Sequence, residues 1–296
     1  YMSVANCTLC PRQCGSDRTN SPGYCGGGEN IRLARAALHF WEEPCISGKN
    51  GSGTVFFSGC QLKCCFCQNY KISAENFGKE VAAERLAEIF LELQAQNASN
   101  INLVSPTHYA GKIIQALDIA KPKLKIPVVY NSSGYENIQT LKMLEGYVDV
   151  YLPDIKYMDS QMSKKYSNAE NYFEYASKAV LEMFRQVGKA VFDENGLIKR
   201  GLIIRHLVLP KGADDTLKII DWISNNLPKE DILLSLMSQY TPCYKSELYP
   251  EINRKISTYE YNKTVKKADE LGFKGYAQQK SSAKEEYTPP FDLEGV

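Results

Sequence analysis

The sequence predicts an α/β protein that forms a partial, TIM-like barrel of six β/α units behind a cysteine-rich N-terminal extension. From about residue 51 onward, short apolar stretches alternate with amphipathic helical patterns, an order typical of parallel strands covered by outer helices. Nine of the ten cysteines fall within the first 67 residues, and only Cys243 lies beyond them. In such barrels the functional residues lie on loops after the carboxyl ends of the strands.

Length and composition are those of a globular protein with a sizeable core. The chain has 296 residues, of which 44% are hydrophobic. The 35 basic and 34 acidic residues nearly cancel, so no charge surplus favours nucleic acid or an anionic membrane surface. No apolar stretch approaches the roughly 20 residues that cross a bilayer, and no signal peptide is recognisable. We therefore expect a cytoplasmic protein, and Tyr1 as first residue indicates a trimmed start.

Three segments are expected along the chain. Residues 1–50 are rich in cysteine, glycine and polar residues and show little periodicity, so we expect bound metal to hold this N-terminal extension together. Residues 51–280 are predicted to form the barrel. Residues 281–296 are predicted to be a C-terminal tail that packs on it.

The barrel strands are predicted from apolar runs without a polar face, as expected where both faces of a parallel sheet are buried. The first helix is predicted from Leu86, Ile89, Phe90 and Leu93, which recur at helical spacing. The predicted strands are 54–58, 101–104, 126–130, 147–152, 202–209 and 232–237, and the predicted helices are 78–98, 112–119, 136–144, 160–188, 214–226 and 259–271.

The loop after the first barrel strand contains Cys60, Cys64 and Cys67 in the spacing C-x3-C-x2-C. Three thiolates in this arrangement can each bind one iron of a 4Fe-4S cluster and leave the fourth iron without a protein ligand. A structural zinc site is less favoured because zinc usually takes four ligands in two pairs. Disulfides are also less favoured, since they need an oxidising compartment.

This spacing, with the aromatic Phe66 directly before the third cysteine, resembles the signature of the radical S-adenosylmethionine (SAM) superfamily. Five longer segments are similar to the glycyl-radical-enzyme activating enzymes, in particular to the pyruvate formate-lyase activating enzyme-like group. The resemblance implies a partial (β/α)6 barrel in which SAM binds the open iron and is cleaved to a 5′-deoxyadenosyl radical. The segments are GSGTVFFSGC (51–60), LVSPTHY (103–109), VYNSSGY (129–135), LPDIKY (152–157) and IRHLVLP (204–210).

The resemblance also implies roles for residues near the cysteines and after the second strand. Phe66 is expected to meet the SAM adenine. Ser105, Thr107 and His108 stand where many relatives carry a Gly-Gly-Glu turn that receives the SAM amino group. Here a histidine that titrates near neutrality replaces an acceptor that is always charged, so His108 is alternatively a substrate-orienting residue or a loop cap.

Further SAM contacts are implied on the later strands. Lys156 is expected to reach the SAM carboxylate or ribose, and Arg205 to face the carboxylate, which its planar fork suits. Asp154, Asn131 and Ser132 match positions that surround a monovalent cation in relatives, although an asparagine replaces the family's acidic residue here. With Gln239, expected at the ribose, the implied SAM-binding residues are Phe66, Ser105, Thr107, His108, Asn131, Ser132, Asp154, Lys156, Arg205 and Gln239.

A second group of cysteines precedes the barrel: Cys7, Cys10, Cys14 and Cys25. Four thiolates close a site completely, whether the metal is zinc or a second 4Fe-4S cluster. The ligand set does not choose between the two metals, since both accept four thiolates. We expect this site to be structural or to relay electrons.

The leading hypothesis is an oxygen-sensitive radical SAM oxidoreductase that abstracts hydrogen from a protein or peptide substrate in trans, as in glycyl radical enzyme activation. The resemblance implies an electron donor such as flavodoxin or ferredoxin. One alternative is a radical SAM enzyme that modifies a small molecule or a ribosomal peptide, with His108 and Cys243 on the substrate side. A rival from another class is a non-catalytic iron–sulfur or zinc protein that serves electron transfer or docking.

Overall fold

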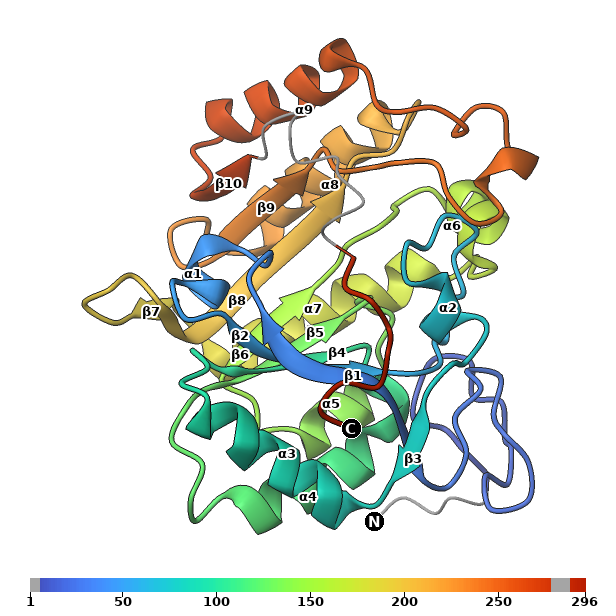
Figure 1. The fold of residues 1–296 in the computed structure, drawn as a ribbon. Helices are drawn as coiled ribbons and strands as arrows, with labels where there is room; N and C mark the ends of the chain where they lie inside the picture. Colours follow the sequence, from blue (N-terminus) through green and yellow to red (C-terminus); the bar gives the residue numbers. More distant parts are fainter. Residues whose placement is uncertain (1–5, 278–287) are drawn as a thin grey trace.

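The computed structural model describes residues 6–277 and 288–296 and has a mostly parallel central sheet (Figure 1). Its strands follow the order β10-β9-β8-β6-β5-β4-β2-β1-β3, and β7 pairs with β8. The six predicted barrel strands are all present and run parallel in sequence order. They are β2 (Ser52–Phe57), β4 (Ile101–Val104), β5 (Val128–Ser132), β6 (Val150–Pro153), β8 (Ile198–Leu207) and β9 (Leu233–Met237).

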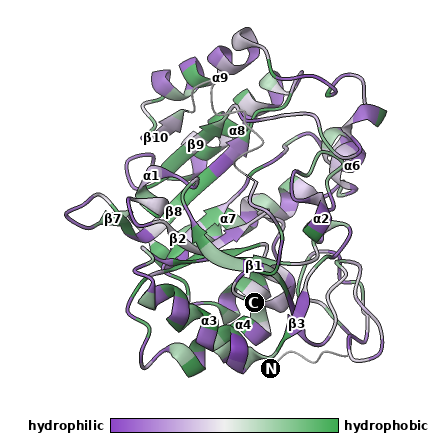
Figure 2. Ribbon diagram, viewed as in Figure 1, coloured by the Kyte–Doolittle hydropathy of each residue, from purple (hydrophilic) through white to green (hydrophobic). Residues whose placement is uncertain are grey.

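Helices cover the outer face of these strands, and their apolar sides pack on it (Figure 2). The predicted helix over 160–188 is two helices, because Asn168 adopts a left-handed conformation (φ 49°) that ends the first. The α-helices are α1 (Pro44–Ser47), α2 (Tyr70–Ser73), α3 (Ala83–Ala95), α4 (Ala110–Ala120), α5 (Ile138–Met143), α6 (Ser160–Ser167), α7 (Tyr172–Val187), α8 (Ala213–Asn226) and α9 (Thr258–Glu270), with 3-10 turns at Thr107–Tyr109 and Ser246–Leu248.

Strands that the sequence analysis did not predict extend the sheet. The strand β1 (Ile31–His39) lies antiparallel to β2 and to β3 (Lys79–Val81). At the other edge, β10 (Gly275–Ala277) pairs in parallel with β9, and the two-residue β7 (Val191–Phe192) forms a hairpin with β8. Residues 31–39 therefore belong to the sheet of the barrel, not to a separate metal-held extension.

The C-terminal tail lies along β1. The amide of Leu293 donates to the carbonyl of Ala34 at 3.0 Å, and the amide of Ala36 donates to Glu294 at 2.8 Å. Phe291 packs edge-on against Phe56 of β2, with ring centroids 5.6 Å apart. The described end of the tail thus covers the inner side of the β1–β2 pair, while residues 281–287 of the predicted tail lie outside the described residues.

The short helix α1 closes one end of the barrel. It begins with Pro44, whose missing amide costs nothing at a first helical position, and its carbonyl at Ile46 accepts from the side chain of Asn100 at 2.8 Å. Cys45 and Ile46 are buried among inward-pointing residues at the amino-terminal halves of the strands. These are Val129, Val150, Leu152, Ile203 and Leu233. We call residues 42–47 the floor.

No helix in the described part of the chain is long and apolar enough to cross a membrane.

Candidate active site

Strand alternation turns one set of side chains into the barrel, and strand register brings them to one level. Phe56 on β2 pairs with Val104 on β4, and Val104 pairs with Asn131 on β5. On the far side Arg205 of β8 pairs with Ser235 of β9. All five residues line one cavity of about 290 Å³ above the floor, so it lies at the carboxyl ends of the parallel strands, where barrel proteins place their chemistry.

The loop of residues 60–67, which we call the cysteine loop, forms the opposite wall of the cavity. Cys64, Phe66 and Cys67 line it directly. The Phe66 ring packs edge-on against Tyr240 with centroids 5.7 Å apart, and the amide of Cys65 donates to the carbonyl of Tyr166 at 2.9 Å. The loop is therefore fixed by packing and backbone hydrogen bonds.

Each sulfur of the predicted cluster ligands accepts one hydrogen bond. The hydroxyl of Ser167 donates to Cys64 Sγ at 3.0 Å, the hydroxyl of Ser73 donates to Cys67 Sγ at 3.2 Å, and the amide of Leu62 donates to Cys60 Sγ at 3.3 Å. Hydrogen bonds to sulfur are one of the means by which proteins tune iron–sulfur clusters.

Burial and the neighbouring thiols keep Cys64 and Cys67 protonated when no metal is bound. Burial raises the pKa of Cys64 to about 12 and that of Cys67 to about 11, and the charges of the nearby thiolates add to both shifts. A metal ligand must be a thiolate, so metal has to replace these protons. Three hydrogen-bonded sulfurs in one loop, two of them in the cavity wall, fit the three-cysteine ligand set of a 4Fe-4S cluster.

A polar network joins the predicted residues of the later strands. Lys156 Nζ lies 2.6 Å from Asp154 Oδ2, and Arg205 Nε lies 3.3 Å from Asp154 Oδ1. Arg205 also donates to Asn131 Oδ1 at 2.6 Å and to Glu42 Oε2 at 3.0 Å. Burial acts to raise the pKa of Asp154, but the two cations hold it below its usual value. The guanidinium is thus held by three acceptors within the protein.

A glycine is required where this network meets β5. Gly134 has φ 73°, and a Cβ there would lie 2.1 Å from the carbonyl oxygen of Asp154. The hydroxyl of Tyr172 donates to the carbonyl of Ser133 at 2.8 Å and accepts from the amide of Lys156 at 2.9 Å. This close backbone contact aims Asp154 and Lys156 at the cavity.

Eight of the thirteen predicted cluster and SAM residues line the cavity, and Cys60, Ser105, Thr107, His108 and Ser132 do not. Thr107 is fully buried, accepts from Gln61 Nε2 at 3.2 Å and donates to Glu136 Oε1 at 2.6 Å. His108 donates from Nε2 to the carbonyl of Ser58 at 2.8 Å, and its backbone carbonyl accepts from Arg18. Burial lowers the pKa of His108 to about 3, so the ring is neutral and supports the backbone beneath the cysteine loop. The eight are Cys64, Phe66, Cys67, Asn131, Asp154, Lys156, Arg205 and Gln239.

Neighbouring side chains of β8 alternate between its two faces, as expected of a strand. Arg205 points into the cavity, while His206 is buried on the outer side, with Nε2 2.8 Å from Thr216 Oγ1 of α8.

Cys243, which the sequence analysis considered for the substrate side, lies directly behind the cysteine loop. Its Sγ donates to the carbonyl of Phe66 at 3.2 Å.

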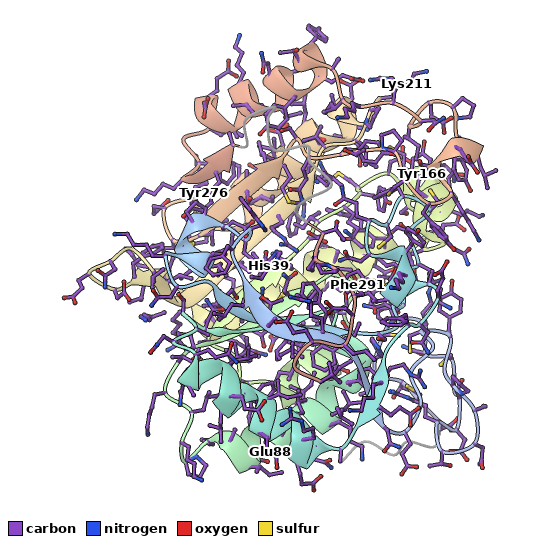
Figure 3. The ribbon with its side chains drawn as sticks, viewed as in Figure 1. His39, Glu88, Tyr166, Lys211, Tyr276 and Phe291 are labelled. Atoms are coloured by element: carbon purple, nitrogen blue, oxygen red, sulfur yellow. The ribbon has the colours of Figure 1, made fainter. Side chains whose placement is uncertain are left out.

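Sequence reasoning missed the residues that come from the N-terminal side of the barrel. His39, Trp41, Glu42 and Glu43 all line the cavity, and Figure 3 shows His39 entering from β1 and Tyr276 from β10. No motif marks them. Pro44, which follows Glu42 and Glu43, was the one available signal, since proline favours the first turn of a helix.

The four N-terminal cysteines lie in a segment, residues 6–30, that we call the head. Cys7, Cys10 and Cys25 are buried and Cys14 is exposed. Burial raises the pKa of Cys10 to about 12, and the charges of Cys25 and Cys7 raise it further. A Cβ at Gly23 would lie 3.4 Å from the sulfur of Cys14 and 3.6 Å from that of Cys25. These two thiols of the head are therefore close to each other.

The head contacts the cysteine loop directly. The amide of Cys60 donates to the carbonyl of Cys25 at 3.0 Å. Arg12 donates to the carbonyls of Gln61, Ser167 and Asn168, and its guanidinium lies 4.5 Å from the centre of the Tyr24 ring. The two groups of cysteines are thus neighbours.

No three histidine, cysteine or acidic side chains in residues 6–277 and 288–296 converge on a point where one ion would bind. The cysteine loop does not need such convergence, because each thiolate of a 4Fe-4S cluster binds a different iron. For the head, the choice between zinc and a second cluster stays a prediction.

Comparison with known proteins identifies relatives. The family model of the Radical SAM superfamily matches residues 54–223. An uncharacterized protein of Methanocaldococcus jannaschii, MJ0674, is 33% identical over 274 residues, which cover 89% of this chain and 74% of that protein.

Solved structures resemble the chain at lower identity. SuiB of Streptococcus suis, bound to precursor peptide SuiA, is 14% identical with a TM-score of 0.49 over 76% of this chain. Methylornithine synthase (PylB) is also 14% identical with a TM-score of 0.49, over 79% of this chain. The chain spans about half of SuiB (48%) and 63% of PylB.

The family match begins in the strand before the cysteine loop and ends in α8, so it includes the three clustered cysteines and covers more than half of the chain. Membership of this family implies an enzyme with a 4Fe-4S cluster and SAM. The chain belongs to the radical SAM superfamily.

Proposed function

We propose that this protein reductively cleaves SAM at a 4Fe-4S cluster bound by Cys60, Cys64 and Cys67, and that the resulting radical abstracts hydrogen from a protein or peptide substrate in trans. The observation that carries the proposal is the position of the cysteine loop. Two of its three hydrogen-bonded cysteines, Cys64 and Cys67, line the cavity at the carboxyl ends of six parallel strands, and Cys60 lies in the same loop.

Cys60, Cys64 and Cys67 would hold the cluster, which would supply the one electron needed to cleave the C5′–S bond of SAM to methionine and a 5′-deoxyadenosyl radical able to take a hydrogen atom from the substrate. Among the cations of the cavity lining, Lys156 is influenced by the cysteine loop: against the effect of burial, Asp154 raises its pKa, and Cys64 and Cys67 add to that rise. This position supports binding of the SAM carboxylate by Lys156. The aromatic ring of Phe66 offers the adenine an apolar face at the cavity wall.

Apolar residues form part of the cavity wall. These are Phe56, Phe66 and Tyr240, and the floor closes the lower end.

The test is anaerobic reconstitution with iron and sulfide, followed by assay of 5′-deoxyadenosine from SAM under a strong reductant. The wild type is expected to form it, and the Cys60/Cys64/Cys67→Ala triple variant is expected to form none above background. Cys65→Ala is the matched control, because Cys65 lies in the same loop but outside the motif. Equal cleavage by the triple variant contradicts the proposal.

The activating role is a finer part of the proposal. The reduced, SAM-loaded protein is incubated with candidate glycyl radical enzymes, and electron paramagnetic resonance is used to look for a protein glycyl signal. A signal supports activation of such an enzyme. Its absence with every candidate removes the activating role but not the cleavage of SAM.

We further propose that the head holds a zinc ion or a second 4Fe-4S cluster, and that an electron donor of the flavodoxin or ferredoxin class supplies the electron. The hydrogen bond between Cys60 and Cys25 supports a close contact between the two sites. Metal analysis of the Cys60/Cys64/Cys67→Ala variant separates the alternatives, because zinc and iron remaining there are bound by the head.

A further inference from the structure

The cavity wall that lies away from the cysteine loop contains two adjacent carboxylates, Glu42 and Glu43. This wall and the cysteine loop contact different parts of the chain around β9. Glu43 bonds to Ser235 within β9, whereas Phe66 contacts Tyr240 beyond the end of that strand. The next residues of the floor are locked into the barrel core. Both carboxylates therefore have fixed positions deep in the cavity.

Glu42 has a partner for each of its oxygens. Its Oε2 pairs with Arg205 at 3.0 Å, and its Oε1 accepts from Asn102 Nδ2 at 3.0 Å and from Asn131 Nδ2 at 3.3 Å. This carboxylate is already satisfied within the protein and fixes the end of the Arg205 side chain.

Glu43 differs, because one of its oxygens has no partner. Its side chain is 8% exposed and lines the cavity, and Oε2 makes no hydrogen bond. A buried acceptor without a donor is destabilising, so such an atom at a cavity wall indicates a donor that arrives with a ligand.

The cations along the described cavity lining are engaged elsewhere. Lys156 and Arg205 both pair with Asp154. His39 is the other basic residue of the lining, and burial and the charge of Arg35 lower its pKa to about 4, so it is neutral near pH 7. Burial raises the pKa of Glu43, and the charge of Arg205 acts against that rise. Among the described residues, the unsatisfied oxygen of Glu43 nevertheless has no cation in hydrogen-bond contact.

We propose that Glu43 binds a primary ammonium group of the substrate, so that the substrate is a lysine side chain in a peptide or a small alkylamine. The inference rests on the proposed function, because it takes this cavity as the place of hydrogen abstraction. With the ammonium at the floor, an alkyl stem runs between aromatic walls toward the cysteine loop. Trp41, Phe56 and Phe66 form those walls, which suit the methylene groups of such a stem.

Binding can be measured without the chemistry of the loaded enzyme. Trp41 lines the cavity, and the second tryptophan, Trp222, lies on the outer helix α8. In a Trp222→Phe background, fluorescence therefore reports on the cavity. The probes are n-pentylammonium and N-acetyl-lysine amide, with n-pentanol and N-acetyl-norleucine amide as their neutral counterparts.

We expect the charged probes to bind at least tenfold more tightly than their neutral counterparts, as a charge-assisted hydrogen bond implies. Glu43→Gln should remove that difference, and Glu43→Asp should keep part of it. Glu88→Gln on the outer face of α3 is the control and should change nothing. Equal binding of charged and neutral probes by the Trp222→Phe protein overturns the inference, and this comparison needs no variant of Glu43.

The relative affinity of the two charged probes identifies the source of the ammonium. Tighter binding of N-acetyl-lysine amide indicates a peptide side chain, and tighter binding of n-pentylammonium indicates a small amine. Both results agree with the inference.

A second measurement separates failure of this inference from failure of the proposed function. With SAM and reductant, n-pentylammonium deuterated along its chain should transfer deuterium to 5′-deoxyadenosine, which mass spectrometry detects. Charge-selective binding without any SAM cleavage overturns the proposed function alone. SAM cleavage with equal binding of charged and neutral probes overturns the role of Glu43 alone.

Discussion

The head and the cysteine loop hold their thiols by different means. The loop is packed among large buried side chains, such as Tyr157, Tyr172 and Tyr240. The head has no comparable apolar cluster among the described residues and is held by turns, by Arg12 and by Arg18. The difference indicates that the barrel forms the loop before metal binds, whereas the head depends on metal for much of its stability.

The largest expected effect comes from removing metal. In the chelator-treated protein, amides of the head, such as those of Cys7 and Gly15, should exchange hydrogen at least about a thousandfold faster than in the reconstituted protein. Amides of the cysteine loop that bond to the barrel, such as Cys65, should change less than about tenfold. Hydrogen–deuterium exchange with mass spectrometry measures both. Equal loss of protection in the two regions would show that they depend on metal alike.

A pH experiment tests the part of the molecule between the head and the cysteine loop. Glu136 is fully buried, accepts from Thr107, and its charge acts on the thiol of Cys10. Burial raises the pKa of Glu136 from 4.5 to about 7. Between these values the unfolded chain releases a proton that the folded chain keeps, so the free energy of unfolding falls as pH rises, by about 3 kcal/mol in total.

Glu136→Gln should remove this loss, since it keeps the acceptor for Thr107 but cannot ionise. Urea unfolding of both proteins from pH 4.5 to pH 8 measures the difference. Below the lower pKa the two curves should converge on a constant offset. Parallel curves across the whole range would exclude an ionisable, buried Glu136.

Arg12 offers a smaller test of the contact between head and loop. Arg12→Lys loses the planar fork that reaches three carbonyls and the stacking on Tyr24. Because the side chain is partly exposed, we expect about 2 kcal/mol of lost stability. Arg32→Lys, which pairs with Glu80 at the surface, is the control and should cost less than about 0.5 kcal/mol. Equal losses in the two variants, measured by denaturant unfolding, would show that the fork adds nothing.

The smallest effect is expected at the sulfur of Cys64. Ser167→Ala removes a hydrogen bond that stabilises charge on this sulfur, so it should lower the cluster's reduction potential by the equivalent of about 1 kcal/mol. Ser163→Ala, in the same helix, removes only a bond to a backbone carbonyl and serves as the control. Redox titration of the reconstituted proteins measures the potential directly, and an unchanged potential contradicts the expected role of Ser167.

The barrel was predictable because each of its strands is a continuous apolar run between helices. The strand β1 was not, since Arg32 and Arg35 interrupt its apolar residues and their ion pairs depend on distant partners. The break between α6 and α7 depends on one left-handed asparagine, a conformation that a helical pattern of polar residues does not reveal.

The site was predictable where a motif fixes spacing and not where folding alone brings residues together. Cys64 and Asp154 follow strands, Arg205 lies near the carboxyl end of β8, and all three line the cavity as position alone would suggest. Glu42 and Glu43 come from a segment with no motif, and only the packing of α1 into the barrel places them there. His108 shows the reverse case. Its position in the sequence predicts a role in the site, yet in the fold it is a buried, neutral residue that supports the backbone.

The position of the floor in the chain has a consequence for biosynthesis. A ribosome makes residues 42–47 early, yet Ile46 packs against Ile203 and Leu233, which emerge after most of the barrel. The nascent chain therefore cannot close the floor end of the cavity until β9, the last of the six barrel strands, has been made. Such long-range pairing is slow. A cluster inserted after this late closure would meet the three thiols of the cysteine loop already in position.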